Sequence, residues 1–236
     1  MCMGITDELE GELDVMQLSD SFFPTGLFAT SSGLESLFLN KKVTTVGQLI
    51  EFNRTCLEQQ VGPGDCVVLA NAIDLCASEM YGKIREADAL CSAMKTIREI
   101  REASFRSGIQ MARCVREFQG GDKVLGWYWE EIQNGRVTGV YPVSFAICCN
   151  ALGITKERSL LMLLYGFVAS TAGAALRLGM IQHFESQKMI HDLKPLISKI
   201  AKESSAKSLE DVWQFSPQME INQMYHEEMN SKMFIT

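Results

Sequence analysis

The stretch "SLLMLLYGFVASTAGAAL" at residues 159–176 contains no charged side chain over its 18 residues, which is the lower limit for a segment that crosses a bilayer. It begins directly after Lys156, Glu157 and Arg158 and ends at Arg177. One marginal segment in a chain of net charge −7 is weak support for a membrane span. We therefore predict that it is the buried core helix of a soluble protein. Its Gly, Ala, Ser and Thr residues allow another helix to approach closely.

Apolar residues recur at helical spacing on both sides of this core helix. The segment "VGPGD" at 61–65 is expected to end one helix, and Asp65 is expected to cap the next. Residues 84–118 predict one long helix or two nearly collinear helices, followed by loops at 119–126 and 134–142. Further helices are expected at 143–152, 156–178 and 182–202, the last one bent at Pro195.

The chain as a whole predicts one all-α domain. No stretch alternates apolar and polar residues for long enough to form a sheet, so we expect a single helical-bundle-like domain of about eight to ten helices. We place an acidic N-terminal tail at 1–13 and the domain at 14–203. A linker with a C-terminal partner-binding helix and tail follows at 204–236. In it, Ser216 and Pro217 suit the N-cap and the first position of a closing helix.

Charge and cysteine usage restrict the class of protein. The net charge of −7, without a block of Lys and Arg, argues against a nucleic-acid partner. The acidic N-terminus lacks the basic and apolar regions of a secretory signal. The eight cysteines are scattered, apart from Cys148 and Cys149, and form no CxxC motif. They are typical of reduced thiols, so we expect a cytoplasmic protein that does not bind membranes.

The stretch "SDSFFPTGLFATSSGLES" at 19–36 is rich in Gly, Ser and Thr. Such a loop could bind a phosphate, hold a nucleophile or dock another protein. Six residues separate Gly26 from Gly33, where a P-loop has four, and no Lys follows Gly33. Ser31 and Ser32 lack the GxSxG elbow of a nucleophilic serine. The docking role is therefore the best interpretation.

The chain also lacks a recognisable metal or catalytic motif. His183 and His191 are rotated by about 80° from one another on an α-helix, and "HEEM" at 226–229 lacks the second His of HExxH. We expect no catalytic residue, no cofactor and no metal site in the chain itself. Transient metal contact at a site shared between chains stays open.

Several stretches together resemble one known family. The opening stretch resembles the N-terminal signature of the urease accessory protein UreF family through Leu18, Ser19, Pro24, Gly26, Ser31, Gly33, Leu34 and Glu35. Further stretches resemble the family in the same order, at residues 98–114, 135–154, 173–187 and 215–236. The likeness covers nearly the whole chain.

Two departures from the family pattern concern the C-terminus and the turn after the core helix. The family commonly ends in Arg-Leu-Phe, whereas Lys232, Met233 and Phe234 stand here. Lysine keeps the charge but loses the bidentate fork of arginine. Met180 and Gln182 replace a Pro and a Gly of bacterial members, which suggests a eukaryotic-type member.

The resemblance implies an all-α homodimeric chaperone that acts as a scaffold and is not an enzyme. Its partners would be the accessory protein UreD (also called UreH), the GTPase UreG and apo-urease. It would couple GTP hydrolysis to nickel insertion, with nickel and GTP handled by the wider complex. The alternative is a generic cytosolic helical adaptor unrelated to urease.

The resemblance also assigns residues to partners. The UreD-facing residues would be His226, Glu227, Lys232, Met233 and Phe234. Glu35 and Arg177 would face UreG or urease, although each could instead compensate a helix dipole. The loop residues Pro24, Gly26, Ser31 and Gly33 would have a structural role.

Two further features of the sequence bear on assembly. Aromatic residues suited to interfaces gather in the C-terminal region, namely Trp213, Phe215, Tyr225 and Phe234. We predict that this region is mobile in the isolated protein and becomes ordered against UreD. A row of small residues in the core helix could pack against a twin chain or within the core, and it comprises Gly166, Ala169 and Gly173.

Overall fold

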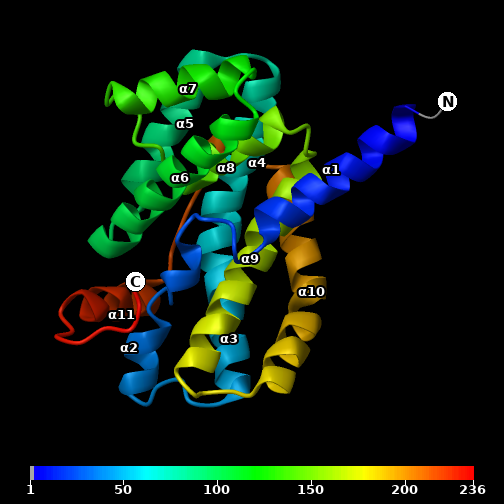
Figure 1. Cartoon of the computed structure of the whole chain (residues 1–236). Helices are drawn as coiled ribbons and strands as arrows, with labels where there is room; N and C mark the ends of the chain where they lie inside the picture. The colour runs from blue at the N-terminus through cyan, green and yellow to red at the C-terminus, as the bar shows by residue number, and fades with distance from the viewer. Residues whose placement is uncertain (1–2) are drawn as a thin grey trace.

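The computed structural model describes the backbone of residues 3–236 and the side chains of residues 9–236. Within that part of the chain every regular element is a helix (Figure 1), which confirms the all-α prediction. The α-helices are α1 Met3–Ser19, α2 Leu34–Leu39, α3 Val46–Cys56, α4 Val67–Ala77, α5 Tyr81–Met94, α6 Arg98–Phe118, α7 Lys123–Gln133, α8 Tyr141–Ala151, α9 Lys156–Arg177, α10 His183–Ser205 and α11 Pro217–Glu227. Two short 3₁₀-helices, η1 Leu27–Ala29 and η3 Leu209–Asp211, and a π-helix, η2 Leu57–Cys66, complete them.

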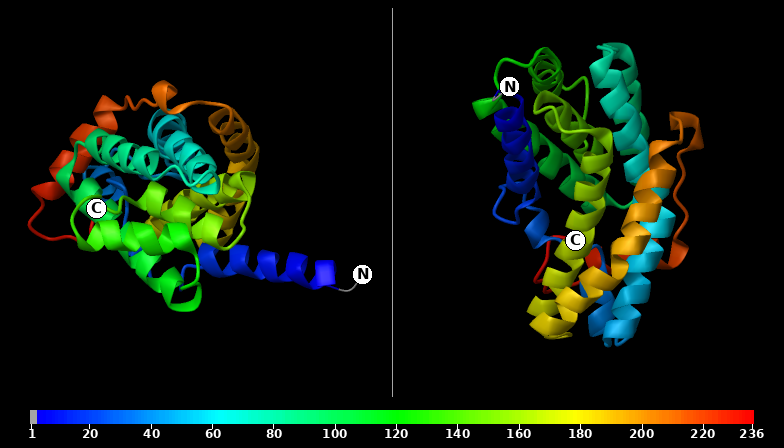
Figure 2. Two further views of the ribbon diagram at one scale, coloured as in Figure 1. Left: turned by 90° about the horizontal axis from the view of Figure 1, so that it is seen from above. Right: turned by 90° about the vertical axis from the view of Figure 1, so that its right-hand side faces the viewer.

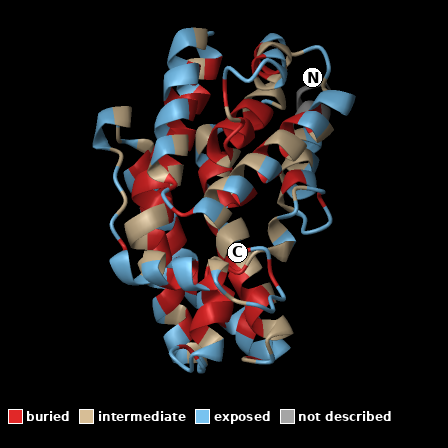
Figure 3. Cartoon of the chain, turned by 90° about the vertical axis from the view of Figure 1, so that its left-hand side faces the viewer, coloured by how far each residue is buried: buried red, intermediate tan, exposed pale blue. Residues whose placement is uncertain are grey.

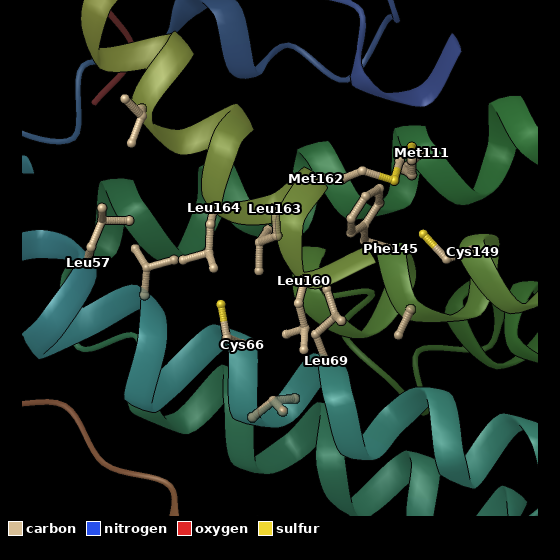
Figure 4. Close-up of a cluster of buried hydrophobic side chains, with 14 of the residues drawn as sticks. Leu57, Cys66, Leu69, Met111, Phe145, Cys149, Leu160, Met162, Leu163 and Leu164 are labelled. Atoms are coloured by element: carbon tan, nitrogen blue, oxygen red, sulfur yellow. The ribbon is translucent and has the colours of Figure 1, made fainter. Parts of the chain in front are cut away.

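Helix α9 is the central helix of the fold. It packs against α10, α8, α4 and η2, and Figure 4 shows its residues Leu160 and Leu164 among the buried side chains of neighbouring helices. By length and composition α9 could cross a membrane, but most of its apolar residues are enclosed by the rest of the chain. The prediction of a buried core helix is confirmed. Figure 3 shows the buried residues concentrated where helices face one another.

The predicted helix break at residues 61–65 is wrong. Helices α3 and α4 are joined by η2, so the backbone stays helical from Val46 to Ala77. Pro63 cannot donate to the carbonyl of Gln59 as a regular α-helix would require, and a π-helical segment accommodates this loss. Asp65 lies inside η2 and caps no helix; it pairs with Lys95 at 2.8 Å.

The middle of the chain differs from prediction in one element. Residues 84–118 form two helices, α5 and α6, separated at 95–97. The predicted loop at 119–126 is wrong in its second half, because α7 begins at Lys123. Asp122 caps that helix by accepting a hydrogen bond from the amide of Leu125 at 2.7 Å.

Both ends of the chain are largely structured. Residues 3–13 belong to α1, which projects from the body of the molecule (Figures 1 and 2). The region 204–236 contains the end of α10, then η3 and α11. Ser216 stands before α11, but its hydroxyl makes no capping hydrogen bond and is buried without a partner. Ser216 as N-cap residue and Pro217 as first helical residue are therefore confirmed as predicted, but the cap lacks a side-chain hydrogen bond.

The linker before α11 is bonded to the π-helix. The amide of Phe215 donates to the carbonyl of Gln59 at 3.1 Å, and the amide of Trp213 donates to the carbonyl of Pro63 at 3.2 Å. The first of these carbonyls is the one that Pro63 leaves without its α-helical donor. The irregularity in η2 thus provides the attachment for the linker.

Candidate functional site

The last residues of the chain return to the loop that precedes α2. The amide of Ile235 donates to the carbonyl of Ala29, and the amide of Ser31 donates to the carbonyl of Thr236, each at 2.8 Å. The buried hydroxyl of Ser31 donates to the same Thr236 carbonyl. The two segments are therefore joined by hydrogen bonds in both directions.

Glu35 is the main anchor for this return. It lies in the first turn of α2 and is 4% exposed. Its Oε1 accepts a hydrogen bond from the amide of Met233 at 2.8 Å, and its Oε2 accepts one from the amide of Phe234 at 3.1 Å. A buried carboxylate requires such donors or an opposite charge. Glu35 therefore binds the C-terminal segment directly.

His226 links Glu35 to a second carboxylate. This histidine of α11 is fully buried, with Nε2 3.1 Å from Oε2 of Glu35 and Nδ1 2.7 Å from Oε2 of Glu99. Lys232 donates to the other oxygen of Glu99 and to the carbonyl of Glu227. Burial opposes ionisation of Glu99, but the hydrogen bonds from Lys232 and His226 outweigh it and lower its pKa. We call Glu35, Glu99, His226 and residues 232–236 the clasp.

Glu227, the last residue of α11, contacts the start of α6 next to the clasp. Its Oε1 accepts a hydrogen bond from the amide of Glu99 at 2.9 Å, and its Oε2 lies 3.5 Å from the guanidinium of Arg98. The first amides of an α-helix have no partner within the helix. Glu227 of α11 therefore acts as an N-terminal cap for α6 and fixes the two helices together.

Arg177 lies between two aromatic rings at the end of α9. Its guanidinium carbon is 4.1 Å from the ring centre of Phe28 and 4.4 Å from that of Phe234. It also donates to the carbonyls of Phe28 and Gly173. Cation–π contacts of this kind attract the rings to the cation. Arg177 thus fastens Phe234, which is buried, to the opening loop.

Glycines shape the loop that receives the clasp. Gly26 and Gly33 have φ values of 80° and 87°, in the left-handed region that favours glycine. A Cβ on Gly33 would also lie 2.9 Å from Cγ of Gln223 in α11. Pro24 is exposed at the turn before Gly26. Gly33 therefore permits both the turn and the close approach of α11.

The structure brings together residues that the sequence assigned to separate partners. Glu35 and Arg177 contact the same C-terminal residues that were assigned to UreD, including Met233 and Phe234. Sequence reasoning did not single out Glu99. No local signal marks it, because its burial depends on α11.

The outer face of α11 and of the C-terminal segment carries several exposed apolar side chains. They are Ile221, Met224, Tyr225, Met233 and Ile235, and the linker adds Trp213 and Phe215. Three of the four predicted aromatic residues are therefore exposed, whereas Phe234 is buried. The inner side of the C-terminal region is thus bound to the rest of the chain, and its outer side is exposed to solvent. Its mobility in the isolated protein stays a prediction.

Two hollows flank α9 near the clasp. One, of about 180 Å³, lies beneath the C-terminal segment, with Thr236, Gln223 and the Asp65–Lys95 pair in its lining. The other, of about 340 Å³, is lined by the opening loop, by α10 and by the row of Gly166, Ala169 and Gly173. A Cβ on Gly166 would meet no atom within 4 Å. This chain therefore leaves part of the row uncovered.

The polar groups of the clasp bond mainly to one another and to the backbone of the chain. Among the residues that the structure describes, no cluster of His, Cys, Asp and Glu side chains has the arrangement of a metal site. The clasp carboxylates are occupied by hydrogen bonds from the chain itself.

Comparison with known proteins identifies the family. Residues 43–194 match the family model described as UreF. Among curated proteins, the urease accessory protein UreF of Trichodesmium erythraeum is 30% identical over 98% of this chain and 99% of its own length. The proteins of the same name from Photorhabdus laumondii and Yersinia enterocolitica are 27% and 28% identical, each over 93% of this chain and 96% of its own length. The chain therefore belongs to the UreF family.

Proposed function

We propose that this protein is a urease accessory protein that acts as a non-enzymatic scaffold in nickel insertion into apo-urease. It would link UreD (UreH) to the GTPase UreG and couple GTP hydrolysis to nickel delivery, while nickel and GTP stay with the wider complex. Family membership and the names of the relatives support a role in urease maturation. A cytoplasmic location accords with this role and stays a prediction.

The apolar outer face of α11 is the observation that carries the proposed contact with UreD. Ile221, Met224 and Tyr225 are exposed at helical spacing, while His226 on the opposite side is buried in the clasp. Exposed apolar patches of this kind are typical of protein interfaces, and a rigid helix loses little entropy on docking. UreD would therefore bind this outer face.

Glu35 and Arg177 could contact UreG or urease, as predicted, only after a movement of the C-terminal segment. Glu35 is buried under Met233 and Phe234. It would reach a partner only if the C-terminal segment moved. Arg177 is half-buried between Phe28 and Phe234, so the same movement would expose more of it.

The uncovered row of small residues favours a homodimer. Gly166 and Ala169 line a hollow of about 340 Å³ beside the exposed side chains of Tyr165 and Phe28. Small residues let helix backbones approach closely. A second copy would therefore pack against this face of α9.

Co-purification tests the proposed contact with UreD. The double change Met224→Ser and Tyr225→Ser should abolish capture of a UreD-like partner without changing the circular dichroism spectrum. Phe184→Ser is the matched control, because Phe184 is 91% exposed on α10, away from α11. Equal capture by all three proteins would exclude the outer face of α11 as the UreD contact.

Gene deletion separates this function from that of an unrelated helical adaptor. Loss of urease activity with the urease polypeptide still present would support a role in maturation. Unchanged urease activity would favour the adaptor.

A further inference from the structure

We propose that the clasp is a proton-sensitive fastening, in which protonated His226 holds residues 232–236 against the opening loop and loss of that proton releases them. The proposal concerns the isolated chain and is independent of the proposed partners. It rests on the position of one buried imidazole between two carboxylates.

The charged groups around His226 come from four parts of the chain. Glu35 faces it from α2 and Glu99 from α6, while Lys232 reaches Glu99 from the C-terminal segment. Glu227, the neighbour of His226 on α11, is directed to the start of α6, where it meets Arg98. The imidazole itself therefore contacts two anions.

Hydrogen-bond geometry favours the imidazolium form. Both ring nitrogens of His226 lie within 3.1 Å of carboxylate oxygens. A neutral imidazole donates from only one nitrogen, whereas the imidazolium donates from both. With the neutral ring, a nitrogen lone pair would face a carboxylate oxygen in a buried site.

Charge balance leads to the same conclusion. Protonated His226 and Lys232 together neutralise Glu35 and Glu99. Loss of the imidazolium proton leaves one negative charge uncompensated, and Glu35 and His226 are both almost fully buried. An uncompensated buried charge is strongly unfavourable. Water can reach Glu35 only if the segment above it moves.

Loss of the His226 proton would affect the C-terminal segment because Glu35 binds the amides of that segment. Hydration of Glu35 competes with its hydrogen bonds to the amides of Met233 and Phe234. Their loss leaves the segment attached by Lys232, by the contact of Phe234 with Arg177, and by the hydrogen bonds to Ala29 and Ser31. Release also removes Thr236 from the wall of the 180 Å³ hollow.

The sign of the pH effect follows from the two kinds of group. The contribution of His226 is complete while both ring nitrogens donate, and it is lost when the ring gives up one proton. The contribution of Glu99, whose pKa is lowered, is present at neutral pH and is lost as the pH falls through that pKa. The clasp is therefore weakened by loss of the imidazolium proton in one direction of pH and by protonation of Glu99 in the other.

Amide hydrogen exchange of the full-length isolated chain tests the proposal. In the wild type, protection of the Met233, Phe234 and Ile235 amides, corrected for the intrinsic exchange rate, should fall about tenfold between about pH 5.5 and about pH 8.5. Amides in α9 should keep their protection. His226→Gln should leave the three amides weakly protected at both pH values, and the exposed His183→Gln control should behave as the wild type.

Two results would overturn the proposal. One is equal protection of these amides in the wild type at both pH values, and the other is an unchanged pH dependence in His226→Gln. If His226→Gln does not fold, Lys232→Gln decides the matter, because removal of the second cation should alter the pH at which the segment is released. A release pH equal to that of the exposed Lys202→Gln control would contradict the charge-balance argument.

Discussion

Gly62 and Ile200 are so close that a Cβ on Gly62 would lie 2.6 Å from Cγ2 of Ile200. The contact joins the π-helix η2 to α10, and the hydroxyl of Ser204 adds a hydrogen bond to the carbonyl of Gly62 at 3.0 Å. A glycine in a continuous helix costs stability relative to alanine. Here the absence of a side chain permits the packing of α10 against the core.

Gly62→Ala should destabilise the protein by about 1–3 kcal/mol, because the added methyl group overlaps Ile200 and the carbonyl of Leu57. Urea denaturation measures this change. Gly47→Ala in α3 is the control, since a Cβ there meets no atom within 4 Å, and it should stabilise by up to about 1 kcal/mol. Equal effects of the two changes would show that the close approach at Gly62 is not important.

Asp88 should be among the most sensitive polar residues of the fold. It is 1% exposed and accepts hydrogen bonds from the hydroxyl of Tyr128 at 2.7 Å, from the amide and hydroxyl of Thr138, and from the amide of Val140. Asp88→Ala would leave these donors without an acceptor. We expect a loss of about 3–5 kcal/mol in the free energy of unfolding.

Chemical denaturation of Asp88→Ala against Asp192→Ala, an exposed aspartate of α10, measures this effect. The control should differ from the wild type by less than about 0.5 kcal/mol. A loss below 1 kcal/mol for Asp88→Ala would show that water replaces the carboxylate, contrary to its burial.

How far the sequence predicts this structure depends on the range of the interactions. The core helix α9 is predictable because a long stretch without charged side chains must be buried, either within the protein or in a membrane. The irregular N-terminal loop is predictable from its proline and glycines, and the structure shows Gly26 and Gly33 with left-handed backbone angles. Both signals are local.

The errors of prediction arise from contacts between distant segments. Pro63 would end a regular α-helix because it cannot donate a backbone hydrogen bond. In this protein the helix continues as a π-helix, and the linker amide of Phe215 bonds the carbonyl of Gln59 instead. Glu35 and Met233 are 198 positions apart, so nothing in either neighbourhood shows that they touch. Glu99 is 127 positions from His226 and looks like an ordinary surface residue in a charged helix.

Glu131 should make stability depend on pH in acid. Hydrogen bonds from Arg136 and Arg85 lower its pKa to about 2, compared with about 4.3 for an unperturbed glutamate. Its stabilising effect is therefore complete above about pH 4.3 and is lost as the pH falls toward 2. Urea denaturation of the wild type at several pH values from 2 to 6 measures that loss.

Glu131→Gln isolates the contribution of this carboxylate. The variant should be less stable than the wild type at pH 6, and the difference should shrink as the pH falls toward about 2. Glu130→Gln, a change of the exposed neighbouring residue, should show no such convergence. A constant difference between Glu131→Gln and the wild type at all pH values would contradict the assignment.

Gly166→Leu should prevent the proposed homodimer without unfolding the chain. Residue 166 lies in the uncovered part of the small-residue row, where a Cβ meets no atom within 4 Å, and a leucine side chain there would block close approach of a second α9. Light scattering coupled to size-exclusion chromatography should give a dimer for the wild type and for Gly82→Leu, an open position in α5, and a monomer for Gly166→Leu. A dimer in all three proteins would place the interface elsewhere, and a monomeric wild type would refute a dimer of the isolated chain.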